Sequence, residues 1–108
     1  MRAKANSHTA AIVLSTWYDT VSRKTGQIES TSNNFQNHYY FESELDEVFT
    51  RFRELTQDYS SVQVNRALRA DTPVKDYVGD EDYYYVQLWV DNASLREQVQ
   101  RQIDAWSV

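Results

Sequence analysis

The chain has 108 residues, no cysteine and a formal net charge of −5. This length is typical of one domain with room for a single hydrophobic core. The absence of cysteine excludes disulfides and thiolate metal sites and is compatible with a reducing compartment. Because no apolar run approaches the roughly 20 residues needed to span a bilayer, we expect a soluble, cytoplasmic protein.

A hairpin of two long strands is expected after a loose tail over residues 1–8. Residues 9–21 are rich in Ala, Ile, Val, Thr and Trp, which favours a strand. Residues 22–27 predict a turn in which Gly26 is free to take a positive φ. The second strand is expected from Ile28 to Phe41, with a bulge or a frayed edge at the Asn-rich residues 32–34.

The first helix is predicted by one apolar stripe with spacings of three and four residues. Ser43 is the expected N-cap, and Asp46 and Glu47 then lie in the first turn, where the helix dipole favours anions. The helix is expected to end near residues 58–61. Its stripe consists of Phe41, Leu45, Val48, Phe49, Phe52, Leu55 and Tyr59.

A third strand is predicted over residues 62–70 and ends before Pro73, which cannot donate a backbone hydrogen bond. Residues 74–82 are expected to form a loop. The fourth strand, residues 83–90, carries the strongest strand pattern of the chain. Its even-numbered residues form a core face, whereas Tyr83, Tyr85 and Trp89 point to the opposite face.

The second helix is expected to open at Asp91, Asn92 or Ser94, and Ser94 with Glu97 fits a capping box. Its apolar stripe consists of Leu95, Val99, Ile103 and Trp106.

These elements predict an α+β fold in the order ββαββα, forming a single domain over residues 9–108. Each helix has one apolar stripe, so we expect a two-layer sandwich: a four-stranded, mainly antiparallel sheet with both helices on one face. Its other face, with Tyr83, Tyr85 and Trp89 beside Val13 and Trp17, is then open unless the tail or the hairpin closes it. The predicted core is Ile12, Leu14, Leu45, Val48, Phe49, Phe52, Leu55, Val86, Leu88, Leu95, Val99 and Ile103.

No catalytic motif is present in the sequence. Of the two histidines, His8 lies in the tail and His38 has no acid at ligand spacing. The two glycines, Gly26 and Gly79, are too far apart to form a phosphate-binding loop. No nucleophile-elbow motif occurs. We therefore expect a protein without catalytic activity, metal or cofactor.

An acidic cluster is the basis of the alternative that the protein is a carboxylate- or metal-dependent hydrolase. Asp76, Asp80, Glu81 and Asp82 lie close together in the sequence. Their spacing does not match an EF-hand, and this mismatch favours a solvated loop over a cation site.

The acidic residues are concentrated in two segments, which favours a basic protein partner. Residues 42–58 hold six acids and two bases, and residues 71–82 hold five acids and one base. Such a surface repels phosphates, so direct binding to nucleic acid is not expected. The predicted partner-binding residues are Asp76, Tyr77, Asp80, Glu81, Asp82, Tyr83, Tyr85 and Trp89.

The resulting functional hypothesis is a small acidic module that masks a basic surface of a protein partner. Carboxylates on one loop mimic phosphate charge, and adjacent tyrosines supply apolar contact area. Inhibitors from phages and other mobile elements, including anti-CRISPR proteins, are similar in kind, but no motif here is specific to them. The alternative is an accessory subunit or a homodimer that uses the aromatic sheet face; no membrane contact is expected.

Overall fold

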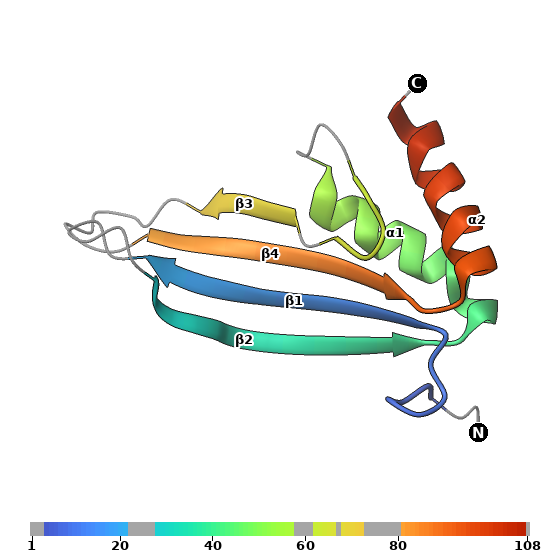
Figure 1. The fold of residues 1–108 in the computed structure, drawn as a ribbon, viewed down its shortest axis with the longest axis horizontal. Helices are drawn as coiled ribbons and strands as arrows, with labels where there is room; N and C mark the ends of the chain where they lie inside the picture. The colour runs from blue at the N-terminus through green and yellow to red at the C-terminus, as the bar shows by residue number, and fades with distance from the viewer. Residues whose placement is uncertain (1–3, 22–27, 58–61, 67, 73–80, 108) are drawn as a thin grey trace.

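The computed structural model describes residues 4–21, 28–57, 62–66, 68–72 and 81–107. Its elements follow the order β1, β2, α1, β3, β4, α2, with a short 3₁₀ turn before α1 and another after α2. The predicted α+β class, with an antiparallel sheet and two helices, is confirmed (Figure 1).

Three long antiparallel strands make up most of the sheet. They are β1 (Ile12–Val21), β2 (Ile28–Tyr40) and β4 (Glu81–Val90), and β1 lies between the other two. The five-residue segment β3 (Leu68–Thr72) pairs with the outer edge of β4 through its backbone. The prediction that residues 74–82 form a loop is wrong at its end, because Glu81 and Asp82 are already the first residues of β4, opposite β1.

The strand β2 is longer than its partner and absorbs the difference in bulges. Between the pairs Thr16–Gln36 and Tyr18–Asn33, β1 advances by two residues and β2 by three. Further register shifts follow toward Ile28. The predicted irregularity near residues 32–34 is therefore a bulged region, which twists this edge strand and makes it a poor template for pairing.

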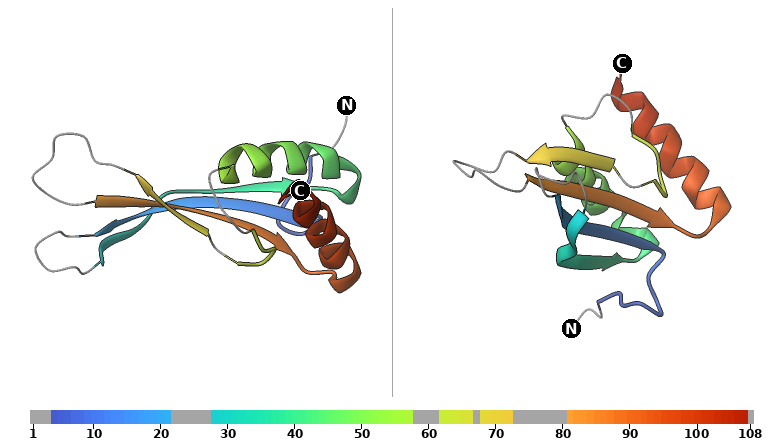
Figure 2. Two further views of the ribbon diagram at one scale, coloured as in Figure 1. Left: turned by 90° about the horizontal axis from the view of Figure 1, so that it is seen from above. Right: turned by 60° about the vertical axis from the view of Figure 1, so that its left-hand side comes forward.

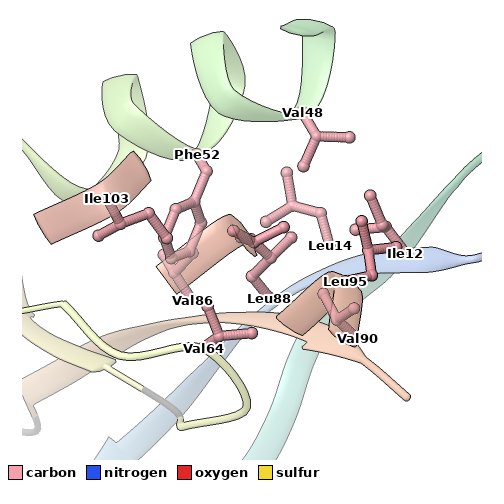
Figure 3. Close-up of a cluster of buried hydrophobic side chains, with 11 residues drawn as sticks. Ile12, Leu14, Val48, Phe52, Val64, Val86, Leu88, Val90, Leu95 and Ile103 are labelled. Atoms are coloured by element: carbon pink, nitrogen blue, oxygen red, sulfur yellow. The ribbon is translucent and has the colours of Figure 1, made fainter. Parts of the chain in front are cut away.

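Both helices contribute side chains to one core on one face of the sheet (Figure 3). α1 (Leu45–Thr56) contributes Val48 and Phe52, and α2 (Ala93–Asp104) contributes Leu95, Val99 and Ile103. The strands supply Ile12, Leu14, Val86, Leu88 and Val90. Nine of the twelve predicted core residues are buried, whereas Leu45, Phe49 and Leu55 are only partly buried and flank the core.

The helices cover only one end of the sheet, where β1 begins and β4 ends. In Figures 1 and 2 the strands continue well past both helices toward the other end. No helix in the described part of the chain is long and apolar enough to cross a membrane.

The start of α1 differs from the prediction. Ser43 is not the N-cap, because residues 42–44 form a 3₁₀ turn and α1 begins at Leu45. The Glu44 carboxylate accepts a hydrogen bond from the Phe41 N–H at 3.0 Å, and this contact closes the turn from its other end. The carboxylate of Glu44 thus bonds back to the residue before the turn, whereas the predicted serine cap would have accepted from an N–H inside the first helical turn.

Residues 62–66 are not the strand that their alternating pattern predicted. Asn65 adopts φ 62°, which interrupts an extended chain. Its N–H donates to the Leu88 carbonyl at 2.8 Å, and its side-chain amide accepts from the Val90 N–H at 2.7 Å and donates to the Val90 carbonyl at 3.1 Å. One residue in a left-handed conformation, which Asn tolerates well, therefore satisfies three backbone groups of β4 beyond the end of β3.

A side chain of α2 also forms hydrogen bonds with the backbone of residues 62–64. The Gln100 side chain accepts a hydrogen bond from the Val64 N–H at 2.8 Å and donates to the Val62 carbonyl at 2.9 Å. Asn92 is the N-cap of α2, with its side chain accepting from the Leu95 N–H at 2.9 Å. Of the three predicted openings of this helix, Asn92 is thus correct, and the capping box at Ser94 is wrong.

Candidate functional site

The face of the sheet opposite the helices is the candidate site, and we call it the open face. Nine of its described side chains form three rows across β2, β1 and β4, set by the strand registers, and the buried Asp19 follows Trp17 on the same face of β1. The tryptophan row holds Phe35, Trp17 and Tyr85; the amide row holds Asn37, Ser15 and Gln87; the valine row holds Tyr39, Val13 and Trp89. None of these nine side chains carries a charge at neutral pH.

The tryptophan row is a continuous stack of three rings from three strands. The Trp17 ring lies 5.3 Å from the Tyr85 ring and is parallel to it within 1°. On its other side the Trp17 ring lies 5.6 Å from the Phe35 ring at 29°. Trp17 and Tyr85 are directly opposite in the register, whereas Phe35 reaches the stack through the bulge in β2. Stacked pairs of this kind stabilise a sheet and hold the rings in fixed orientations.

The amide row is polar and hydrogen-bonded. The Ser15 hydroxyl donates to the Asn37 side-chain oxygen at 2.6 Å. Ser15 is buried, whereas Asn37 is exposed and Gln87 is half-buried. The row therefore offers amide donors and acceptors in the middle of an aromatic surface.

The valine row contains the large exposed ring of Trp89. This side chain is 43% exposed, and its indole N–H donates to the Asp91 carboxylate at 2.6 Å. At the opposite corner of the open face Phe35 is 50% exposed. Two large rings on one sheet are therefore exposed to water, and the described residues of the tail and the hairpin leave them so.

The structure brings together only part of the predicted binding site. Tyr85 and Trp89 lie on the open face with Val13 and Trp17, as their alternation predicted. Asp76, Tyr77 and Asp80 lie outside the described residues, and for Glu81, Asp82 and Tyr83 only the backbone of β4 is described. The clustering of the acidic loop therefore stays a prediction.

Sequence reasoning did not assign Phe35 and Tyr39 to this face. Their alternation with Gln36 and His38 was visible, but the hairpin register that puts them beside Trp17 and Val13 was not. The bulge near Asn34 breaks the simple parity between β1 and β2. Tyr39 pairs directly with Val13 in the unshifted part of the hairpin, and only Phe35 lies beside the first register shift.

A concave region lies between the helices and carries a different set of side chains from the open face. It is lined by α1, α2 and residues 62–64. The Arg53 guanidinium sits 5.3 Å from the centre of the Trp106 ring, which also meets the Phe49 ring edge-on at 5.8 Å. These contacts join the 3₁₀ turn after α2 to α1 and leave Trp106 partly buried.

The described part of the chain offers few groups that could serve as metal ligands or as acids and bases. No group of three or more His, Asp or Glu side chains there is placed to hold a metal ion. His38 is exposed on β2. Burial raises the pKa of the Tyr40 hydroxyl, with the positive charge of Arg51 opposing the shift, so this group stays neutral at physiological pH.

Comparison with known proteins adds no relative. No protein-family model matches the chain, and no curated protein and no solved structure is significantly similar to it.

Proposed function

We propose that the protein is a non-catalytic protein-binding module and that the open face is its contact surface. The observation that carries this proposal is the half-exposed pair Phe35 and Trp89, which lie on one face of the sheet. Aromatic residues with one polar tip are enriched in protein interfaces because they supply contact area at low entropic cost.

The energy available at these rings is large for a surface site. An aromatic side chain covers about 150–250 Å², so the exposed halves of Phe35 and Trp89 amount to roughly 100 Å² each. At about 25 cal/mol per Å², covering both would contribute about 5 kcal/mol. The Trp17 stack already fixes the Phe35 ring, so little further rotamer entropy is lost on binding.

A protein ligand fits this surface better than a nucleic acid. Sheets that stack bases on aromatic rings combine them with basic side chains that neutralise phosphates. The nine side chains of the three rows include no Lys or Arg, and the tenth described residue on this face, Asp19, is acidic. Stacking without that electrostatic contribution is a weak basis for nucleic-acid affinity.

The more detailed predictions from the sequence, on the fourth strand and on the acidic loop, are also part of this proposal. We infer that β3 acts as a full fourth strand, which extends the open face beyond β4. The masking of a basic partner surface by Asp80, Glu81 and Asp82 is a separate version of protein binding, in which charge leads the contact. An inhibitor of phage or mobile-element type is one class of protein that works in this way.

Affinity capture with matched variants tests the proposal. The baits are the wild type, Phe35→Lys and Gln36→Lys. Both variants add one positive charge to the same strand, but Gln36 is exposed on the opposite face. We expect a protein that the wild type and Gln36→Lys retain and that Phe35→Lys loses. Retention of the same proteins by all three baits would contradict the proposed contact surface.

A further inference from the structure

We propose that residues 62–66 are a conformational switch, in which the bend seen in the structure gives way to a straight continuation of β3 along the edge of β4. Both arrangements use the same segment and the same strand edge. This inference goes beyond the proposed function, on which only the effect of the switch on binding rests.

Two side-chain amides hold the bend, and each pairs with backbone groups as a neighbouring strand would. The Asn65 amide accepts from the Val90 N–H at 2.7 Å and donates to the Val90 carbonyl at 3.1 Å. The Gln100 amide accepts from the Val64 N–H at 2.8 Å and donates to the Val62 carbonyl at 2.9 Å. Two polar side chains therefore stand in for strand partners on the two sides of this segment.

The bend is offset by one residue from the register of β3. That register, continued by two residues beyond Leu68, places Arg66 opposite Leu88. The Leu88 carbonyl instead accepts from the Asn65 N–H, at 2.8 Å. A slip of one residue would therefore let the β3 ladder continue over residues 64–66.

Val64 stays in the core in both arrangements. It is 9% exposed in the bend and belongs to the same buried cluster as Leu88 and Val90 (Figure 3). In the continued register Val64 would be opposite Val90, whose side chain lies on the helix face of the sheet and is fully buried. The switch therefore does not require this apolar side chain to enter water.

The two arrangements offer similar numbers of hydrogen bonds. In the bend, Asn65 makes three with β4 and Gln100 makes two with the segment. In the strand, the residues opposite Leu88 and Val90 would each exchange both backbone hydrogen bonds with them. The strand also releases Asn65 from φ 62°, which is a less favourable backbone conformation than an extended one. Hydrogen bonding and backbone strain together thus leave the two arrangements close in free energy.

Arg66 is the residue that keeps the segment in the bend. It is exposed there, and its guanidinium donates to the Gln63 side-chain oxygen at 3.2 Å. In the strand its side chain would lie on the helix face beside Leu88, which is fully buried. Burying a charge without a partner is costly. One charged side chain thus decides between two otherwise similar arrangements.

The strand arrangement would change the open face beside Trp89. In the bend Trp89 is 43% exposed, and the Asn65 amide bonds to the Val90 backbone. In the strand, residue 65 would be opposite Trp89, with its side chain on the open face. A ligand that covers Trp89 meets different neighbours in the two arrangements, so it shifts their populations by the difference in its affinity for them.

Nuclear magnetic resonance tests the switch by identifying the amide that bonds to the Leu88 carbonyl. The scalar coupling across this hydrogen bond comes from the N–H of residue 65 in the bend and from that of residue 66 in the strand. Arg66→Val removes the charge, and Gln63→Val is the matched control, because both variants break the Arg66–Gln63 hydrogen bond and add one valine. We expect the strand to be at least about tenfold more populated in Arg66→Val than in Gln63→Val.

The wild type should show the same strand as a minor state. We expect the amides of residues 64–66 and 88–90 to exchange on the microsecond-to-millisecond timescale with a state that has the chemical shifts of Arg66→Val. Arg66→Thr is the second variant if Arg66→Val does not fold, as judged by circular dichroism. The switch is overturned if residue 65 remains the donor to Leu88 in the Arg66 variant, or if the wild type shows no exchange at these residues.

The failure of this inference differs from the failure of the proposed function. The resonance experiments use the isolated chain, so they can refute the switch while Phe35→Lys still loses a captured protein. Equal capture by the wild type and Arg66→Val would overturn the effect of the switch on binding. If capture does not depend on Phe35, the proposed function fails, and the donor to Leu88 still decides whether the switch exists.

Discussion

Replacing Asn65 tests whether this one residue supplies the hydrogen-bond partners for the edge of β4 in the part that β3 does not reach. The side chain makes two hydrogen bonds to the Val90 backbone, at 2.7 and 3.1 Å, and the backbone has φ 62°. Each hydrogen bond contributes about 0.5–1.5 kcal/mol to stability. An alanine in the left-handed region is about 1–2 kcal/mol less stable than one in a right-handed or extended conformation. We therefore expect Asn65→Ala to lower the free energy of unfolding by about 2–5 kcal/mol.

Asn65→Gly separates the two contributions. Glycine loses both hydrogen bonds but takes a positive φ without a steric cost, so we expect a loss of about 1–3 kcal/mol. Glycine should thus be the milder substitution by about 1 kcal/mol, although it usually costs more than alanine inside regular structure.

Urea unfolding followed by circular dichroism gives both free energies. A loss below about 1 kcal/mol for Asn65→Ala would show that water replaces the side chain at Val90 without penalty. A more stable Asn65→Ala than Asn65→Gly would show that the positive φ is relaxed in solution. Either result refutes the account of residues 62–66 as an edge closure.

Three further predictions concern the core, the α2 contact and the acidic loop. Phe52→Ala should lower the free energy of unfolding by about 3–5 kcal/mol, because the ring is fully buried; a loss under about 1 kcal/mol in a urea melt would contradict that packing. Gln100→Ala should cost about 1–3 kcal/mol, since two backbone groups lose their partner, and unchanged hydrogen exchange over residues 62–64 would contradict the contact. If charge leads partner binding, affinity should fall between about 50 and 500 mM NaCl, and the triple variant Asp80→Asn, Glu81→Gln, Asp82→Asn should reproduce that fall; equal binding by the triple variant would reject the masking hypothesis.

Much of the fold follows from side-chain periodicity. The stripe with Val48 and Phe52 predicted α1, and the alternation from Tyr84 to Val90 predicted β4, because burial on one face imposes these periods. Residues 62–66 also alternate, with Val62 and Val64 on one side, yet they are held by hydrogen bonds rather than by a ladder. Alternation of side chains does not show that a side chain, here that of Asn65, replaces a neighbouring strand as the hydrogen-bond partner of β4. The sequence pattern therefore predicted a strand where there is none.

The open face was predictable only in part, for a geometric reason. Val13, Trp17, Tyr85 and Trp89 belong to two strands whose pairing has no register shift, so parity alone assigns them to one face. The rings on β2 depend on the register of the hairpin, and Phe35 also lies beside a bulge; local sequence fixes neither. The start of α1 was also not fixed by the sequence. Both Ser43 and Glu44 have side chains that can accept a hydrogen bond from a backbone N–H near the start of a helix, and the structure uses Glu44.

Hydroxyl-radical footprinting measures most directly whether the open face is a protein contact surface. The oxidation rates of exposed aromatic side chains are compared between the dilute chain and the chain in its associated state, whether with itself or with a captured protein. We predict that Phe35 and Trp89 become protected at least about threefold, because covering a half-exposed ring removes most of its contact with water. His38, exposed on the other face of β2, should react at an unchanged rate. Protection at His38 or along the helices, with Phe35 and Trp89 unchanged, would contradict the assignment of the open face as the binding surface.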